Sequence, residues 1–104
     1  MYSKLSIIIP AYNEERTIVA VLESVMAVKL PYELKKECIV VDDCSKDQTA
    51  KFVRNFKVNH PDFILQLIHH KNNKGKGASV QTAISQLTGD IVVFQDADLE
   101  CDPQ

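Results

Sequence analysis

The chain has 104 residues, of which 45% are hydrophobic and 25% are charged, and its net charge is −2. This length predicts one domain with a modest core, and the composition excludes a disordered chain. The charge excludes the broad basic field that nucleic-acid binding needs, and no apolar run approaches the ~20 residues of a membrane span.

The three cysteines are Cys38, Cys44 and Cys101, an odd number without a C-x-x-C pair. This pattern predicts neither a disulfide framework nor a structural zinc site. Free thiols are typical of a reducing compartment, so we expect a cytoplasmic protein whose cysteines fill half-buried positions.

The first expected element is a buried strand over residues 5–9, which Pro10 ends. An amphipathic helix follows it. Asn13 is expected to cap this helix, and Glu14 and Glu15 suit the positive end of the helix dipole in the first turn. The apolar stripe of the helix recurs at helical spacing and comprises Ile18, Val21, Leu22 and Val25.

A second buried strand is predicted over residues 38–41, and the pair Asp42-Asp43 stops it. Ser45 and Gln48 match a capping box, which predicts that a second helix starts there. The apolar positions of this helix are Ala50, Val53 and Phe56.

A third strand is predicted over residues 63–68, where partial apolar alternation is typical of a sheet edge. Residues 69–77 form a polar loop with lysines and glycines, which we call the lysine loop. A third helix should follow it and end at Gly89, and residues 91–94 read as an interior strand. The apolar stripe expected on this helix is Val80, Ala83, Ile84 and Leu87.

Strands and helices thus alternate with short connections, which predicts an α/β fold with a mostly parallel, Rossmann-like sheet and right-handed crossovers. We expect the strand order 3-2-1-4, with helices flanking the sheet. Ligands bind such sheets beyond the carboxyl ends of the strands. The residues after strands one and four should therefore meet at one rim.

Carboxylates gather after three of the four predicted strands. A cluster of like charges is costly unless cations or hydrogen-bond donors are bound, which favours a divalent metal with a nucleotide. Asp96 and Asp98 lie on one side of an extended chain, about 6.6 Å apart, and Glu100 continues that side. Their hard oxygens suit Mg²⁺ or Mn²⁺. An Asp-x-Asp pair alone is a weak signal, and its place after a buried strand favours a metal site over solvated aspartates.

Other residues at the strand ends have two interpretations each. A carboxylate of the pair Asp42-Asp43 can accept from a base or a ribose hydroxyl, or start the next helix. Tyr12 can stack on a base or lie on the surface, and Glu14 can hold a base or ribose or stabilise a helix dipole. The histidines lack partners at a convincing spacing, which favours solvent or loop roles for His60, His69 and His70.

Three lysines of the lysine loop alternate with glycines that let the backbone approach a phosphate, and a helix N-terminus follows. No GKS or GKT sequence closes the loop, so it is not a P-loop, and a solvated loop is the alternative. The lysines are Lys71, Lys74 and Lys76.

Four segments together resemble family 2 glycosyltransferases of the GT-A fold. They are IIIPAYNE at 7–14, VVDDCSKDQT at 40–49, NKGKGA at 73–78 and QDADLECDP at 95–103. The nearest subgroup is the polyprenyl- and dolichyl-phosphate sugar synthases. The resemblance covers essentially the whole chain, and four motifs in order are far more specific than any one of them. Cys44 departs from the family, which usually has Gly or Asn there.

The resemblance implies roles for individual residues. Base and ribose contacts fall on Pro10, Ala11, Tyr12, Glu14 and Asp43. The resemblance also implies that Lys76, Asp96 and Ala97 contact the nucleotide. It implies that the metal ion, Mg²⁺ or Mn²⁺, is bound by Asp96, Asp98 and Glu100.

The resemblance also implies an activity, which is inverting transfer of a sugar from a UDP- or GDP-sugar to an acceptor. The acceptor is a polyprenyl phosphate or a saccharide, and a general base is expected beyond Gln104. Residues 1–104 are then the nucleotide-sugar-binding part of a truncated glycosyltransferase domain. We expect this part to bind nucleotide without transferring sugar and to self-associate through strand 91–94. The full-length protein could associate with the cytoplasmic face of a membrane.

The main alternative is a non-catalytic nucleotide-binding or interaction module from a truncated gene. A dinucleotide-dependent oxidoreductase is excluded because the first strand is followed by Pro-Ala-Tyr-Asn-Glu and not by G-x-G-x-x-G.

Overall fold

Strands and helices alternate throughout the part of the chain that the computed structural model describes, which is residues 4–29, 35–86 and 91–95. In chain order the elements are β1 (Lys4–Ala11), α1 (Ile18–Ala27), β2 (Lys35–Asp42), α2 (Thr49–Asn59), β3 (Ile64–His69), α3 (Gly75–Ile84) and β4 (Ile91–Phe94). The strands form one sheet in the order β3-β2-β1-β4, and every neighbouring pair is parallel. The predicted fold class and strand order are confirmed.

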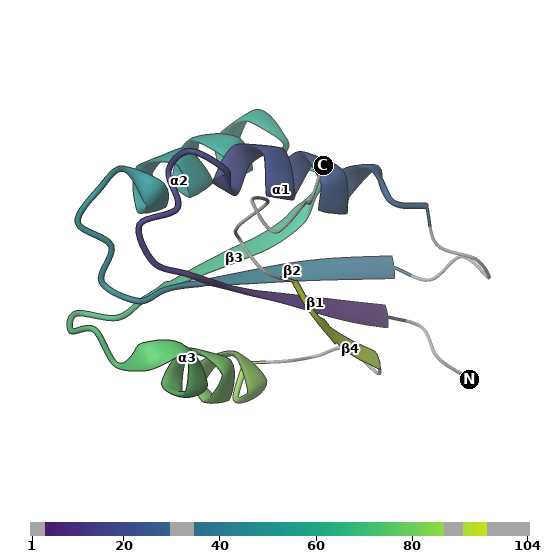
Figure 1. The fold of residues 1–104 in the computed structure, drawn as a ribbon. Helices are drawn as coiled ribbons and strands as arrows, with labels where there is room; N and C mark the ends of the chain where they lie inside the picture. The colour runs from purple at the N-terminus through teal and green to yellow at the C-terminus, as the bar shows by residue number, and fades with distance from the viewer. Residues whose placement is uncertain (1–3, 30–34, 87–90, 96–104) are drawn as a thin grey trace, which may run out of the picture.

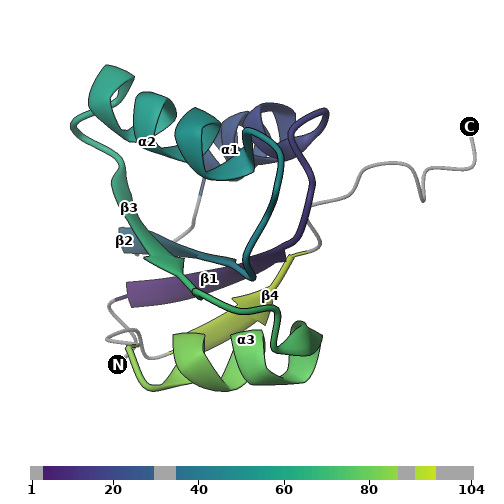
Figure 2. The same ribbon diagram turned by 90° about the vertical axis from the view of Figure 1, so that its left-hand side faces the viewer.

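The helices lie on both faces of the sheet. Helices α1 and α2 cover one face and α3 covers the other (Figure 1), and a view along the sheet separates the three layers (Figure 2). Alternate side chains of the central strands point to opposite faces of the sheet. Ile7 and Ile9 pack with α1 and α2, whereas Ile8 packs with Ala83 of α3. Burial on both faces explains why β1 and β2 read as continuous apolar runs.

The stripe predicted for α1 is confirmed, because all four of its residues are buried in the larger core: Ile18, Val21, Leu22 and Val25. On α2, Val53 and Phe56 are buried as expected. The stripe predicted for α3 is only partly correct, since Ala83 is buried but Ile84 is 49% exposed. The remaining positions predicted there, Leu87 and Gly89, lie outside the described residues.

Pro10 does not end β1, which continues to Ala11. The carbonyl of Ile8 points toward β4, because it accepts from the N–H of Gln95 at 2.9 Å. Alternate residues of a strand point the same way, so the missing N–H of Pro10 also falls on the β4 side. The register between β1 and β4 ends at Ile8, opposite Phe94. Among the residues that the structure describes, no ladder bond of this register is therefore lost at Pro10.

Both predicted helix starts are wrong. Helix α1 begins at Ile18, and Asn13 has a φ of 54°, which an N-cap residue does not adopt. Helix α2 begins at Thr49, and its N-cap residue Gln48 makes no side-chain capping hydrogen bond. Glu14, Glu15 and Ser45 thus belong to loops, where their partners are distant in sequence.

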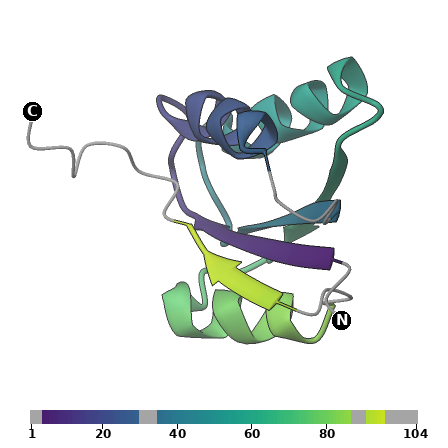
Figure 3. The ribbon, with the colours of Figure 1, turned by 90° about the vertical axis from the view of Figure 1, so that its right-hand side faces the viewer.

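Strand β4 lies at the edge of the four-stranded sheet beside β1 (Figure 3). Its side chains are more exposed than those of an interior strand, and Phe94 is 54% exposed. The edge position that the expected order 3-2-1-4 gives this strand, and the exposed apolar surface expected there, are what the described residues show. None of the described helices is long and apolar enough to cross a membrane.

Candidate functional site

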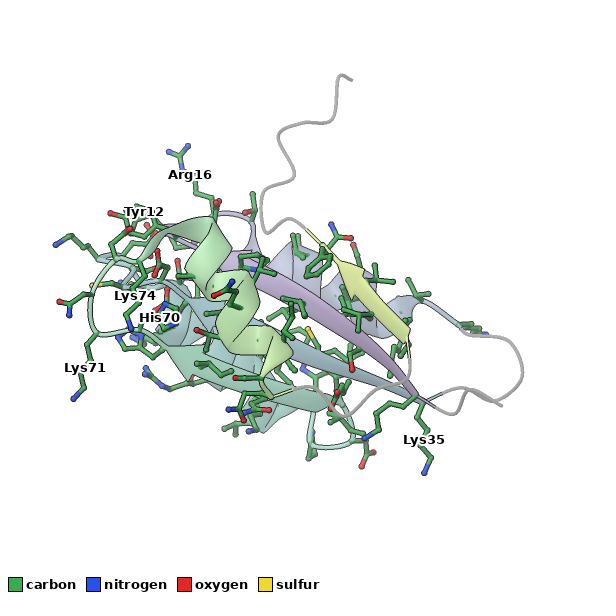
Figure 4. All side chains as sticks on the ribbon, turned by 90° about the horizontal axis from the view of Figure 1, so that it is seen from below. Tyr12, Arg16, Lys35, His70, Lys71 and Lys74 are labelled. Atoms are coloured by element: carbon green, nitrogen blue, oxygen red, sulfur yellow. The ribbon has the colours of Figure 1, made fainter. Side chains whose placement is uncertain are left out.

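The carboxyl ends of β1, β2 and β3 point to the same end of the molecule, and we call these ends and the loops after them the strand-end rim. Tyr12 after β1 and His70, Lys71 and Lys74 after β3 gather there, whereas Lys35 at the start of β2 lies at the opposite end (Figure 4). Parallel strands place all their carboxyl ends on one side, which is why segments far apart in sequence meet.

The loops after β1 and β2 hold each other through reciprocal hydrogen bonds, which we call the loop brace. The backbone N–H of Asn13 donates to Oγ of Ser45 at 2.8 Å. In return, the backbone N–H of Lys46 donates to Oδ1 of Asn13 at 2.8 Å. Asn13 adopts the left-handed conformation that makes this exchange geometrically accessible, and asparagine tolerates that conformation well.

The loop brace continues toward α2. The backbone N–H of Glu14 donates to Oγ1 of Thr49 at 2.8 Å, and that of Glu15 donates to Oδ2 of Asp47 at 3.2 Å. The backbone N–H of Gln48 donates to Oε1 of Glu15 at 3.0 Å. The Ser45–Gln48 capping box therefore does not form, because both of its members bind the other loop.

The carboxylate of Asp47 is an anchor of the brace. Burial raises its pKa, but the hydrogen bonds from the hydroxyl and backbone N–H of Thr49 and from the backbone N–H of Glu15 outweigh burial, so its pKa lies below the ordinary value. A lowered pKa keeps this carboxylate ionised as an acceptor at neutral pH.

Asp42 and Asp43 have different surroundings. Asp42 ends β2 opposite His69 of β3, and its Oδ2 lies 2.8 Å from Nδ1 of that histidine. Its Oδ1 accepts from the backbone N–H of Ser45 at 3.2 Å. Asp42 is fully buried, so its role is to hold the loop after β2.

Asp43 holds the start of α3. Its Oδ1 accepts from the backbone N–H of Lys74 at 2.8 Å and lies 2.9 Å from Nδ1 of His70. Its Oδ2 accepts from the backbone N–H of Gly75 at 2.7 Å. Burial raises the pKa of Asp43, but these hydrogen bonds outweigh burial, so the pKa lies below the ordinary value. The residue is therefore an ionised carboxylate at neutral pH, although it is only 4% exposed.

The lysine loop contributes exposed cations and a positive-φ glycine. Lys71 and Lys74 are exposed, and the side chain of Lys76 lies outside what the structure describes. Gly75 has a φ of +90°, a backbone conformation that favours glycine. No neighbouring atom would contact a Cβ at this position, so the preference comes from the backbone alone. Its N–H and that of Lys74 already bind Asp43, so these two donors at the helix start serve a protein carboxylate.

Cys44 adopts a φ of 65° between Asp43 and Ser45. Its thiol lies 3.2 Å from the carbonyl oxygen of Lys71. Glycine and asparagine adopt this left-handed conformation more easily than cysteine does. The conformation therefore gives a physical reason for the Gly or Asn that the resemblance leads one to expect here. Cys38 is a free thiol that is fully buried and not half-buried as predicted, whereas the half-buried position predicted for Cys44 is confirmed.

Cys44→Asn is expected to raise the free energy of unfolding by about 0.5–1 kcal/mol, because asparagine relieves the backbone strain of the left-handed conformation. Urea denaturation measures this change. Cys44→Ala is the matched control, since it removes the thiol but keeps an ordinary Cβ at the same φ. An alanine variant as stable as the asparagine variant would contradict the backbone explanation.

The structure brings five of the predicted nucleotide contacts to the strand-end rim, namely Pro10, Ala11, Tyr12, Glu14 and Asp43. The predicted metal and phosphate residues Asp96, Ala97, Asp98 and Glu100 lie outside the described residues. Within the described part of the chain, no group of three metal-ligating side chains is present.

The sequence interpretation missed the histidines. His70 was expected in a solvent or loop role, but it is 7% exposed and lies within hydrogen-bond distance of Asp43 and Thr82. One signal was available in the sequence, because Asp42-Asp43 and His69-His70 directly follow strands two and three, which are neighbours in the expected order. The structure places His69 opposite Asp42, and the next residues, His70 and Asp43, therefore also meet. A search for close sequence spacing could not find partners 27 residues apart.

Comparison with known proteins gives consistent relatives. The family model described as glycosyl transferase family 2 matches residues 6–104. The dolichyl-phosphate beta-glucosyltransferase of Dictyostelium discoideum is 37% identical over 101 residues, which cover 90% of this chain and 30% of that protein. The dodecaprenyl-phosphate galacturonate synthase of Rhizobium johnstonii is 32% identical, with 97% and 30% covered. The chain thus spans less than a third of these relatives.

Solved structures agree with the sequence relatives. The mannosyltransferase PcManGT from Pyrobaculum calidifontis, in complex with GDP-Man and Mn²⁺, superposes with a TM-score of 0.85 at 37% identity, covering 90% of this chain and 27% of that one. Staphylococcus aureus TarS in complex with UDP gives a TM-score of 0.81 at 34% identity, covering 91% and 27%. With a family match over almost its full length and these GT-A neighbours, the chain belongs to glycosyl transferase family 2.

Proposed function

We propose that this chain is the nucleotide-sugar-binding part of an inverting glycosyltransferase that uses a UDP- or GDP-sugar. The observation that carries the proposal is that Tyr12, Glu14 and Asp43 all lie in the loops after β1 and β2, at the strand-end rim, and that these loops brace each other. The solved relatives bound to GDP-Man and to UDP support the class of donor.

In this proposal the rim binds the base and ribose. Tyr12 is 41% exposed, so its ring is accessible for stacking on a base. Pro10, Ala11 and Glu14 line the end of β1 and the loop after it. The Asp43 carboxylate is ionised and already oriented by three donors, so a ribose hydroxyl or a base N–H would meet a fixed acceptor.

The diphosphate and its metal are assigned to the segment after β4 and to Lys76. Asp96 directly follows Gln95 in the chain, and the N–H of Gln95 donates to the carbonyl of Ile8 on β1. Its three carboxylates, Asp96, Asp98 and Glu100, provide the hard oxygen donors that Mg²⁺ or Mn²⁺ prefers, and Ala97 would supply a backbone contact. A metal held by these carboxylates would supply positive charge for the departing diphosphate. PcManGT, which was solved with Mn²⁺, supports this assignment.

The acceptor that we propose is a polyprenyl phosphate, since the names of several relatives specify dolichyl or dodecaprenyl phosphate. Its phosphate oxygen is already anionic, so attack on the anomeric carbon needs no strong general base.

In-line attack with departure of the nucleoside diphosphate inverts the anomeric configuration. A retained configuration in the product of the full-length protein would refute this mechanism, and a saccharide acceptor would require a general base. A polyprenyl acceptor lies in a membrane, and we propose that the full-length protein acts at the cytoplasmic face of that membrane.

Calorimetry with UDP and GDP, each with and without Mn²⁺, tests the proposal. One of the two nucleotides should bind, and a chelator should weaken its binding. A non-catalytic interaction module is the second candidate, and failure of both nucleotides to bind at millimolar concentration would favour it.

Residues 1–104 alone are expected to bind nucleotide and transfer no sugar. By resemblance, all the assigned residues hold the donor, and none holds an acceptor. Without acceptor positioning, an advantage worth about 7–11 kcal/mol of the barrier is missing. Incubation with UDP- and GDP-sugars and a polyprenyl phosphate tests this expectation, and steady turnover would contradict it.

The 104-residue chain is also expected to self-associate through β4 as its concentration rises. An exposed apolar strand at a sheet edge favours pairing with another chain, and Phe94 is 54% exposed. Sedimentation velocity of the wild type and of Phe94→Lys tests this prediction, with the lysine variant shifted toward monomer. Val58→Lys is the matched control, since Val58 is 77% exposed on α2, which packs against β3 at the other edge of the sheet. A wild type that stays monomeric at high concentration would contradict the prediction.

A further inference from the structure

The ring of His70 connects the three segments that meet under the lysine loop. His70 follows β3 directly, its Nδ1 lies 2.9 Å from Oδ1 of Asp43 after β2, and its Nε2 lies 2.9 Å from Oγ1 of Thr82 on α3. The side chain is 7% exposed. Both nitrogens of a buried ring are thus bound to protein groups, which fixes the orientation of the ring.

The direction of one of these hydrogen bonds follows from the chemistry of the partners. An ionised carboxylate only accepts, and Asp43 is ionised because its pKa lies below the ordinary value. Nδ1 of His70 therefore carries a proton and donates it to Asp43. The hydroxyl of Thr82 is itself placed by the carbonyl of Ala78, one turn earlier in α3, at 3.0 Å.

Asp43 in turn fixes the backbone of Lys74 and Gly75 in the lysine loop. The oxygen that accepts from His70 also accepts from the N–H of Lys74, and the other oxygen accepts from the N–H of Gly75. If the ring is lost, the carboxylate keeps only the backbone N–H donors of Lys74 and Gly75, at the start of α3. His70 is thus the side-chain donor to Asp43, and it directly follows the sheet strand β3.

We propose that His70 is a positioning residue for the nucleotide site, which fixes the carboxylate of Asp43 and through it the lysine loop. The proposal rests on the function proposed above, in which Asp43 and Lys76 of the lysine loop contact the nucleotide. His70 itself is not required to touch the ligand, because its nitrogens are already occupied by protein groups.

Two substitutions separate the two hydrogen bonds of the ring. The amide nitrogen of asparagine lies as many bonds from Cβ as Nδ1 does, whereas the amide of glutamine reaches the place of Nε2. His70→Asn therefore retains a donor for Asp43, and His70→Gln retains only the link to Thr82. We expect His70→Asn to bind the nucleotide within about threefold of the wild type, and His70→Gln to bind at least about tenfold more weakly.

His69→Gln is the matched control. His69 is the neighbouring histidine, but it pairs with Asp42 and is 43% exposed. Its substitution should leave nucleotide affinity unchanged. Urea denaturation of all three variants shows whether affinity merely follows stability. A merely structural histidine would give losses of affinity that parallel losses of stability in both His70 variants, and this outcome would overturn the proposal.

A measurement on the wild type keeps the proposal testable if a variant does not fold. In ¹⁵N-labelled chain, the Nδ1 proton of His70 should give a slowly exchanging resonance that shifts when UDP or GDP is added with Mg²⁺. If the wild type binds nucleotide and this resonance is absent or unmoved, His70 does not position the site. If the wild type binds neither nucleotide, it is the proposed function that fails.

Discussion

Asp43→Ala is expected to lower the free energy of unfolding by about 3 kcal/mol, because it leaves three buried or part-buried donors without their acceptor. These donors are the N–H groups of Lys74 and Gly75 and Nδ1 of His70. Urea denaturation measures the change. Since Asp43 is also assigned to the nucleotide, the folded variant should bind UDP or GDP more weakly in calorimetry.

Asp62→Ala is the control for this prediction, because Asp62 is an exposed aspartate between α2 and β3. Its substitution should change the free energy of unfolding by less than about 0.5 kcal/mol. Equal effects of the two substitutions would contradict the role given to the Asp43 carboxylate.

The same carboxylate makes stability depend on pH. The pKa of Asp43 is lowered in the folded chain, so its ionised form stabilises the fold above the unfolded pKa of about 3.9. This contribution is lost as the pH falls through the lower, folded pKa. Asp43→Asn cannot ionise, so its deficit in stability relative to the wild type should shrink as the solution is acidified. A constant deficit between neutral and acidic pH would contradict the assignment.

Asp98→Asn is expected to abolish the metal-dependent part of nucleotide affinity. The loss should be on the order of 100-fold, because even outer-shell changes at a metal site cost 10–100-fold. Calorimetry with UDP or GDP in the presence of Mn²⁺, and again with a chelator, measures this part separately. Asp96→Asn should weaken the same term to a smaller extent.

Asp102→Asn is the matched control, since it neutralises a nearby aspartate that has no assigned role. It should keep the response to Mn²⁺. If the wild type bound nucleotide equally well with and without the chelator, the metal assignment of Asp96, Asp98 and Glu100 would be wrong.

The architecture was predictable because it depends on patterns that repeat along the chain. The apolar runs of β1 and β2 and the helical stripe of α1 each mark an element buried by the sheet packing, and alternation of strands and helices then fixes a parallel topology. These features need no knowledge of any single long-range contact. The strand order 3-2-1-4 was expected for another reason, namely the polar residues Tyr12, Glu14 and Asp96 at strand ends, which one ligand site between strands one and four would bring together.

The helix starts and the buried histidine could not be predicted in this way. Capping rules consider a residue and its neighbours within one turn, but Asn13 and Ser45 bind each other across 32 residues. His70 likewise binds a carboxylate that is adjacent only in the folded sheet. In these cases tertiary partners outcompete the local hydrogen bonds that the sequence offers.

The loop brace has a consequence for how such domains can be recombined. Each loop supplies both donors and acceptors to the other, as the exchange between Asn13, Ser45 and Lys46 illustrates. A chimera that takes the loop after β1 from one relative and the loop after β2 from another would break bonds in both directions. The two loops are therefore a single unit for grafting, although α1 and β2 separate them in the chain.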